Sequence, residues 1–512
     1  MGKSKEIYGE HVGYVVDNST PSYVKFVSTN PPPVGDYVVI DRPGKPILGF
    51  VESVGTRSIT LSSLPGSYDP QILDRLRGEA LKTPGDTFFE CTAYLLGDVE
   101  NLEMTRTPPL PGDLVYRASD ELLSSIFGPR GREYIEIGVL VTRPDVKVSI
   151  NINRMVTRHA AILAITGAGK SNTVSIVADR IVEMGGTLLI FDFHGEYVYS
   201  DLGKGRLNVI EPLLSPRLLS FSELQSLLGI PHNAHRQEYV FRQAYRSAKE
   251  SREQRGFLED IRERLEDIAR QDDNRENRRA AIGVINRLEV LMERYGEILE
   301  DVAPRLIDLL KPGYVNVLNL SRVDEEAADV IVSHVLRTML YERKKHKLGE
   351  KSRLQYPVLL VIEEAHILAP KDRDTSSKYW LARIAREGRK FGLGLLLVSQ
   401  RPKILDPNVL SQANNMFILK IVEPSDQRHV QAASESLSDN LLVQLPSLNV
   451  GEAVVIGPMI RLPALVKIYK YEGRLGGADP NVVEEWIKYR ESLYRDSRVV
   501  EDIMSQAEEY WG

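Results

Sequence analysis

The pattern of apolar and polar positions divides the chain into two regions with different periodicity. Residues 7 to about 142 contain short segments in which apolar and polar residues alternate, separated by Gly, Pro and Asn turns. Alternation of this kind is typical of strands that bury one face, so this region predicts a small β-barrel or sandwich. The expected strands are 12–16, 37–40, 50–54, 88–96 and 135–141.

From Arg158 onward, continuous apolar segments are separated by amphipathic helical patterns. A strand that is apolar throughout is buried on both faces, as in a parallel sheet covered by helices. The second region therefore predicts a multidomain α/β protein with one large sheet. Its expected strands are 161–165, 187–191, 314–319, 358–362, 393–399, 416–421 and 453–456.

Two helical additions interrupt or follow this sheet. An Arg- and Glu-rich stretch from Phe221 to about Leu310 has apolar positions three and four residues apart, which predicts an inserted helical subdomain. Near the C-terminus, Asp479 and Pro480 form a helix start signal, and a second helix is expected over 499–510. The apolar faces of these two helices are suited to docking on the same chain or on a neighbour.

Composition narrows the class of protein. The 512 residues include 65 Lys and Arg against 71 Asp and Glu, a net charge of −6, so any site for a polyanion must be a local patch. The single cysteine, Cys91, excludes an internal disulfide or a thiolate metal cluster, and it is expected to be a buried small hydrophobe. The longest apolar runs, 357–362 and 392–398, are too short to span a bilayer. We expect a cytoplasmic protein without a membrane anchor.

The strongest chemical signal is the segment 161–173, an apolar strand that enters a Gly-rich turn and then a helix. It resembles a Walker A P-loop, in which glycines let backbone N–H groups surround a phosphate at a helix N-terminus. Lys170 is expected to reach the β and γ phosphates, and Ser171 to bind Mg²⁺. Ala164 replaces the first glycine of the usual spacing. The expected nucleotide contacts are Thr166, Gly167, Ala168, Gly169, Lys170, Ser171 and Asn172.

A second acidic signal follows the strand 358–362, where Glu363 and Glu364 stand side by side. A central parallel strand presents its carboxyl end to the ligand crevice, and successive residues face opposite ways. We assign Glu363 to Mg²⁺, through a water molecule, and Glu364 to polarising the attacking water. The chain has no Asn-Lys dipeptide with which to read guanine, which favours ATP, and a water-activating glutamate favours hydrolysis.

Three further clusters fit ATP hydrolysis that drives motion. Asp192 and Glu196 follow the strand 187–191 and are placed near the metal or its water, although a capped turn explains them equally well. Gln400 directly follows the strand 393–399 and is suited to sensing the γ-phosphate. Arg383, Arg386 and Arg389 lie at intervals of three residues before Gly392, with a solvated basic face as the alternative.

These motifs occur in an order that resembles the HerA family. The segments that carry the resemblance are 166–172, 192–197, 363–366, 386–392 and 398–402. HerA proteins are archaeal and bacterial ATPases related to the FtsK translocases. The resemblance covers nearly the whole chain.

The resemblance implies four parts: an N-terminal barrel of the HAS type over 1–145, a RecA-like ATPase core over 146–475, a helical insertion over 219–310, and a C-terminal brace over 476–512. It also implies a homohexameric ring that translocates on or unwinds double-stranded DNA, with the nuclease NurA as partner in end resection. Arginine fingers of the family act across the subunit boundary, and the matching residues are Arg389, Arg386 and Arg158.

Other readings stay open. Lys371, Arg373 and Lys378 form a basic loop that is suited to DNA phosphates, as are Lys204 and Arg206, although ordinary solvated loops are the better explanation of both groups. His232 and His235 lack a third ligand for zinc. The alternative functions are a secretion or conjugation ATPase of the same superfamily, and a nucleotide-gated scaffold without catalysis.

Overall fold

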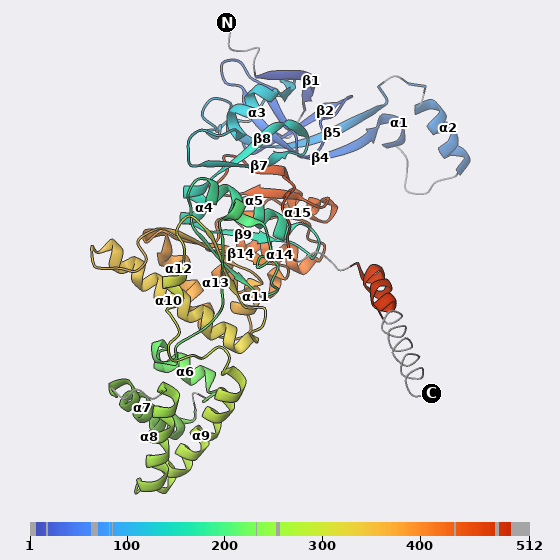
Figure 1. The fold of residues 1–512 in the computed structure, drawn as a ribbon. Helices are drawn as coiled ribbons and strands as arrows, with labels where there is room; N and C mark the ends of the chain where they lie inside the picture. The colour runs from blue at the N-terminus through green and yellow to red at the C-terminus, as the bar shows by residue number, and fades with distance from the viewer. Residues whose placement is uncertain are drawn as a thin grey trace, which may run out of the picture.

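The computed structural model of the chain describes residues 7–16, 19–62, 70–80, 82–83, 85–231, 233–251, 256–434, 437–476 and 481–492. A β-barrel lies at one end, a large sheet flanked by helices in the middle, and a helical lobe at the other end (Figure 1). The protein is therefore mixed α/β with an N-terminal barrel, and the predicted fold class is confirmed.

The barrel is closed and antiparallel, with strand order β1-β2-β5-β4-β3-β6. It forms because polar and apolar residues alternate, as in β2, where every second residue is buried. Cys91 is fully buried in its core, as predicted, and burial raises its thiol pKa to about 12. The strands are β1 (Tyr8–Val15), β2 (Tyr23–Ser28), β3 (Tyr37–Asp41), β4 (Ile47–Ser58), β5 (Thr87–Asp98) and β6 (Leu114–Ala118).

Short helices accompany the barrel. Beyond it, the β4–β5 hairpin extends into an arm that carries α1 (Ile59–Ser62) and α2 (Pro70–Ala80), as Figure 1 shows. Helix α3 (Asp120–Phe127) is capped by Ser119, whose hydroxyl accepts the N–H of Leu122, and it packs against the large sheet.

The large sheet has eleven strands in the order β11-β12-β10-β13-β14-β9-β15-β16-β17-β7-β8. The strands from β11 to β15 are parallel, and the four that follow add antiparallel pairs. All seven predicted strands are present, two with the predicted ends and the others with ends shifted by at most three residues. The strands are β7 (Tyr134–Leu140), β8 (Arg143–Asn151), β9 (Ala160–Leu163), β10 (Leu188–Asp192), β11 (Leu207–Ile210), β12 (Val315–Asn319), β13 (Val358–Ile362), β14 (Leu393–Ser399), β15 (Asn415–Ile418), β16 (Glu452–Ile456) and β17 (Ala464–Ile468).

The structure corrects one expectation about the barrel. The strand expected over 135–141 forms as β7, but it pairs with β17 and β8 in the large sheet and does not belong to the barrel. Alternation shows that a strand has one buried face, but it does not show which sheet the strand joins. Strands β11 and β17 were not predicted, because each has only four or five residues and polar positions within it.

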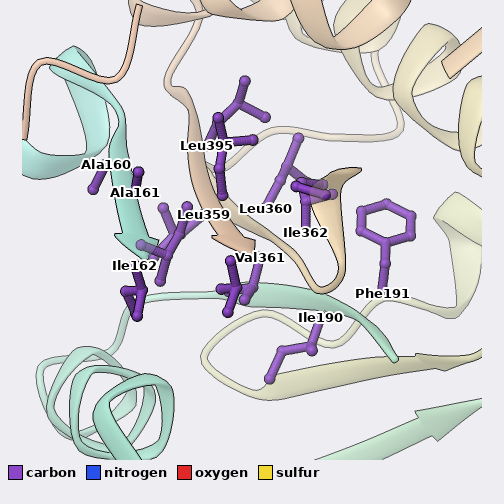
Figure 2. Packing of buried hydrophobic residues seen from close by; sticks show 14 of the residues in the cluster. Ala160, Ala161, Ile162, Ile190, Phe191, Leu359, Leu360, Val361, Ile362 and Leu395 are labelled. Atoms are coloured by element: carbon purple, nitrogen blue, oxygen red, sulfur yellow. The ribbon is translucent and has the colours of Figure 1, made fainter. Parts of the chain in front are cut away.

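The central strands make the core that carries the site. Apolar side chains of β9, β10, β13 and β14 pack together in Figure 2, where Ile162, Ile190, Leu360 and Leu395 are among those labelled. Each fully buried side chain of this size stabilises the fold by about 1.5–3 kcal/mol. The helices of this region are α4 (Ile152–Arg158), α5 (Lys170–Glu183), α10 (Glu325–Lys347), α11 (Ala365–Leu368), α12 (Ser376–Glu387), α13 (Pro407–Leu410), α14 (Pro424–Ala433) and α15 (Asp439–Gln444).

Short 3-10 helices and a helical lobe complete the fold. The 3-10 helices are η1 (Leu202–Gly205), η2 (Pro216–Leu218), η3 (Leu306–Leu309), η4 (Gly388–Lys390), η5 (Pro402–Ile404) and η6 (Leu445–Ser447). The Arg- and Glu-rich stretch folds as α6 (Phe221–Leu227), α7 (His235–Glu250), α8 (Phe257–Gln271) and α9 (Arg275–Tyr295).

A buried carboxylate fixes the lobe to the core. Glu223 of α6 accepts two bonds of 2.9 Å from Arg337 of α10 and lies 3.3 Å from the Nδ1 atom of His334. Although burial raises the pKa of Glu223, these two neighbours outweigh it and hold the pKa at about 2.

The C-terminal helix over 482–492 projects away from the rest of the chain in Figure 1. Val483, Trp486 and Tyr489 are exposed on it. Pro480 and the second predicted helix, 499–510, lie outside the described residues. Within the ranges that the structure describes, no helix is long and apolar enough to cross a membrane.

Candidate active site

The turn between β9 and α5 has the backbone that phosphate binding requires. Gly167 and Gly169 have φ of 76° and 108°, values that favour glycine. A Cβ at Gly167 would meet nothing within 4 Å, so the outer side of this turn is open. Lys170 is the first residue of α5, whose N-terminal N–H groups favour anions. The predicted strand–turn–helix context of the P-loop is therefore present.

Two of the predicted nucleotide contacts, Ala168 and Asn172, are bonded to the backbone of distant segments. Ala168 is buried, and its carbonyl accepts the N–H of Gly451 at 3.0 Å. The Asn172 side chain donates to the carbonyl of Tyr469 and accepts the N–H of Tyr471, both at 2.8 Å. Asn172 therefore holds the segment that follows β17 against the start of α5.

The Ser171 hydroxyl, predicted to bind Mg²⁺, donates a hydrogen bond of 2.6 Å to Glu196. Glu196 is held by Asp192, whose carboxylate accepts the backbone N–H groups of His194, Glu196 and Tyr197. Burial raises the pKa of Asp192, and these N–H bonds partly offset the rise. Asp192 thus shapes the loop, and Glu196 is the acid beside Ser171.

Glu363 directly follows β13 and is buried. Its Oε1 atom accepts a hydrogen bond from the hydroxyl of Tyr197. Burial raises the pKa of Glu363 to about 8, and the nearby carboxylates of Glu196, Glu364 and Asp192 add to the rise. The side chain is therefore held as part of a buried network with Tyr197.

Glu364 has a strained backbone, with φ 43° and ψ 46°. Its Oε1 atom lies 3.6 Å from Nε2 of His194, and its Oε2 atom lies 3.2 Å from Nδ1 of His366. The His366 contact lacks hydrogen-bond geometry, so Oε2 is buried without a hydrogen-bond partner among the described residues. Burial raises the pKa of Glu364, while Lys170 and His194 oppose the rise. A carboxylate in this setting is suited to accept a proton.

Glu196, which is bonded to Ser171, forms an acidic cluster with Glu363 and Glu364 that fits a phosphate-bound divalent cation. Burial and neighbouring carboxylates raise the pKa of both Glu363 and Glu364, and one oxygen of Glu364 is left without a hydrogen bond. A cation stabilises such a concentration of negative charge. No group of three acidic, His or Cys side chains within the described ranges forms a self-sufficient metal site. Mg²⁺ takes few protein ligands together with phosphate oxygens and water, so Ser171 and a nearby carboxylate are the groups that would hold it.

Gln400 lies beside the P-loop. Its Oε1 atom accepts a hydrogen bond of 2.7 Å from the hydroxyl of Thr166. Ser399, the last residue of β14, lies 3.3 Å from Nδ1 of His366 through its hydroxyl. The chain therefore places the predicted sensor, Gln400, against the turn that would hold the phosphates.

The candidate arginine fingers lie at the amino ends of the parallel strands, opposite to the P-loop. Arg158 precedes the first residue of β9, and Arg386 and Arg389 precede β14, whereas the P-loop follows the last residue of β9. Because β9 and β14 are parallel, the arginines and the P-loop of one chain are separated by the length of the strands. Arg158, Arg386 and Arg389 are exposed and form no ion pair with any described residue. Arg383 pairs with Glu387 and stacks on Trp380.

A buried histidine ties the arginine-bearing segments together. His159 Nδ1 accepts the N–H of Leu395 at 3.0 Å, so Nε2 carries the proton that it donates to the carbonyl of Ala385 at 2.9 Å. Burial lowers the pKa of His159 to about 4. The neutral ring therefore links α4, which ends at Arg158, to the end of α12 near Arg386.

The basic loops are largely neutralised. Arg373 pairs with Glu325 at 2.9 Å, Lys378 with Asp406 at 3.1 Å, and Lys204 with Glu183. Lys371 and Arg206 form no ion pair within the part of the chain that the structure describes. His235 starts α7. His232 lies outside the described residues.

Sequence reasoning missed several residues of the site. The fold brings Tyr197 to Glu363 and His194 to Glu364. It also places His159 against the backbone of Ala385 and Leu395, near the arginines. Tyr197 stands next to Glu196 in the motif, but its bond to Glu363 spans 166 positions. The positive φ of Glu364 and His159 also has no signal in the sequence.

A family model described as "Helicase HerA, central domain" matches residues 135–339, and a HAS barrel domain model matches residues 12–102. The chain is similar to three proteins named "DNA double-strand break repair helicase HerA". The one from Sulfolobus acidocaldarius is 41% identical over 94% of this chain and 97% of that protein. The one from Saccharolobus solfataricus is 39% identical over 94% and 96%. The one from Pyrococcus furiosus is 35% identical over 90% and 93%.

Proposed function

The chain belongs to the HerA family of helicases, and from that premise we propose that it is an ATP-driven motor on double-stranded DNA that acts in double-strand break repair. It is an ATP-dependent enzyme, as the helicase names of its relatives indicate. The observation that carries the proposal is that a P-loop and a glutamate lie at the carboxyl ends of the central strands, while arginines that form no ion pair with any described residue lie at the amino ends. The alternative of a secretion or conjugation ATPase is not favoured by these relatives.

ATP hydrolysis would use groups at the carboxyl edge of the sheet. The α5 N-terminus and Lys170 would hold the β and γ phosphates. A water molecule would attack the γ-phosphorus, its proton would pass to the Glu364 carboxylate, and ADP would leave with the bridging oxygen. Gln400 would report loss of the γ-phosphate through its bond to Thr166.

Magnesium would be held by Ser171, with Glu363 and Glu196 close to it, and when bound it neutralises charge on the phosphates. Ser171 must then exchange its bond to Glu196 for the cation. Glu363, bonded to Tyr197, would act through water, as the sequence suggested. Asp192 would support the metal indirectly, through the loop that carries Glu196.

We propose a homohexameric ring because the arginines need a neighbouring subunit. Arg389, Arg386 or Arg158 would reach the nucleotide of the adjoining copy and stabilise the transition state, an effect of about 10³-fold or more. The exposed apolar residues of helix 482–492 would brace that neighbour. NurA is proposed as the nuclease partner.

The test is ATP turnover by the full chain with duplex DNA, single-stranded DNA or no DNA. We expect duplex DNA to stimulate turnover most, and Lys170→Ala to abolish turnover while circular dichroism stays unchanged. Turnover near wild type in Lys170→Ala refutes the nucleotide site. Equal turnover with and without duplex DNA refutes the DNA motor.

A further inference from the structure

A cavity lies near the amino end of β9, opposite to the P-loop. It has a volume of about 670 Å³ and is bounded by α4, by the start of β15 and by the connection between β16 and β17. Arg154, Arg158 and Arg461 line it. Because α4 precedes β9 whereas the P-loop follows β9, this cavity is separate from the predicted nucleotide site of the same chain.

The cavity carries positive charge without compensation. Among the described residues that line it, none is acidic. Its three arginines form no ion pair anywhere in the described ranges. Burial lowers the pKa of Arg461, and the neighbouring Arg130 and Arg154 lower it further. Several guanidinium groups that repel one another across a polar cavity are stabilised by an anion.

Hydrogen bonds to the backbone hold the Arg154 side chain and the segment that carries Arg461 in place. The Arg154 guanidinium donates to the carbonyl of Pro458 at 3.1 Å. The fully buried Asn415 donates to the carbonyls of Arg154 and His159 and accepts the N–H of Met459 at 2.7 Å. One side chain therefore ties α4 to the β16–β17 connection, which carries Arg461.

The barrel supports the same wall. Tyr37, fully buried, donates from its hydroxyl to the carbonyl of Pro463 at 2.6 Å, at the end of the β16–β17 connection. Leu102, in the connection between β5 and β6, also lines the cavity. The arrangement is thus prepared before any ligand arrives, which lowers the cost of binding.

We propose that this cavity is a second phosphate-binding site, in which Arg154 and Arg461 act together with Arg158. Guanidinium groups bind phosphate oxygens in pairs, and the volume accommodates more than one phosphate group. The phosphates come either from the nucleotide of an adjoining subunit or from the backbone of duplex DNA. In both cases the inference rests on the proposed function.

The first experiment measures phosphate binding directly. Inorganic pyrophosphate is titrated by calorimetry into the full chain carrying Lys170→Ala, which removes the P-loop lysine. We expect this chain to bind pyrophosphate at one remaining site. The affinity should fall at least tenfold when Arg154→Gln and Arg461→Gln are added, and it should be largely retained when both arginines are replaced by lysine. The matched control, Arg270→Gln with Arg275→Gln on the helical lobe, should leave binding unchanged.

The assignment is overturned if Lys170→Ala binds no pyrophosphate, or if the Arg154 and Arg461 changes leave its affinity unchanged while circular dichroism shows an intact fold. If the chain binds pyrophosphate in this cavity but its ATP turnover does not respond to duplex DNA, the proposed DNA motor is refuted and the phosphate site is not. The two failures are therefore distinguishable.

The second experiment identifies the source of the phosphates in an otherwise wild-type chain. If the source is DNA, Arg154→Gln with Arg461→Gln should reduce the slope of log affinity for duplex DNA against log salt by about 2 and spare DNA-free ATP turnover. If the source is a nucleotide, DNA-free turnover should fall at least tenfold with the salt slope unchanged. No change in either measurement contradicts the assignment.

Discussion

The hydroxyl of Ser171 donates its hydrogen bond to Glu196, at 2.6 Å, and not to either glutamate at the end of β13. Glu196 therefore controls the direction of the side chain that a P-loop protein uses to bind Mg²⁺. Its place depends on Asp192, whose carboxylate organises the backbone of residues 194–197. The carbonyl of Glu196 also accepts the N–H of Gly476 at 2.8 Å, which connects the loop to the C-terminal segment.

Replacing Glu196 should weaken the use of magnesium. Residues that orient a metal ligand typically change metal affinity by about 10–100-fold when removed. We expect Glu196→Ala to raise the Mg²⁺ concentration at half-maximal ATP turnover by at least tenfold, with nucleotide binding measured in EDTA unchanged. The control is Glu211→Ala, which removes a carboxylate that accepts a hydrogen bond from Asn319. An unchanged magnesium dependence would show that Glu196 does not support the metal.

The paired glutamates should differ when each becomes glutamine. Glu364→Gln should retain ATP binding and reduce turnover by about 10²–10⁴-fold, because an amide cannot accept the proton of water. Glu363→Gln should raise the Mg²⁺ requirement with a smaller loss of maximal turnover, since Glu363 is bonded to Tyr197. Binding of a fluorescent ATP analogue and single-turnover hydrolysis measure the two effects. Full turnover in Glu364→Gln would reverse the assignment.

His159 should make stability depend on pH. Burial lowers its pKa in the fold to about 4, below the ordinary value of 6.5. The unfolded chain therefore binds the proton first, and the stability of the fold should fall as the pH falls from about 6.5 to 4. The difference of about 2.5 pKa units corresponds to about 3 kcal/mol.

Denaturant unfolding of wild type and His159→Gln at pH 7 and pH 4 measures this effect. We expect the variant to be less stable than wild type at pH 7, because it loses the ring hydrogen bonds to Ala385 and Leu395. The difference in the free energy of unfolding should be much smaller at pH 4. An equal gap at both pH values would contradict the buried neutral ring.

The arginines should act between subunits. We expect mixtures of Arg389→Ala chains with Glu364→Gln chains to show ATP turnover above that of either variant alone, because some interfaces then combine an intact Arg389 with an intact Glu364. The same mixing experiment with Arg158→Ala tests whether Arg158 acts between subunits. Turnover that never exceeds the sum of the two separate proteins would show that the arginine does not act in trans.

Much of the fold was predictable because strong periodicity reflects burial. The predicted bounds of the central strands β13 and β14 match the structure to the residue, since each is a continuous buried run that is followed by polar residues. Strand β11 was not predicted, because Leu207–Ile210 is short and includes Asn208. The sheet to which β7 belongs also had no signal, since pairing with β17 joins residues more than 300 positions apart.

The site was predictable in its motifs and less so in its contacts. Gly167, Gly169 and Lys170 lie in one local turn whose conformation follows from residue type. The bonds of Glu196 to Ser171 and of Tyr197 to Glu363 join segments that follow different strands, so spacing along the chain does not show them. Asn172 was expected at the nucleotide, whereas its side chain is bonded to the backbone of Tyr469 and Tyr471.

The central claim is that ATP hydrolysis at this site moves the protein along duplex DNA. Displacement of a short third strand from a DNA triplex measures such movement without requiring the duplex to open. We predict that the wild-type chain displaces the third strand only with ATP and Mg²⁺, and that Lys170→Ala and Glu364→Gln do not displace it. Displacement without ATP, or undiminished displacement by Glu364→Gln, would contradict the account.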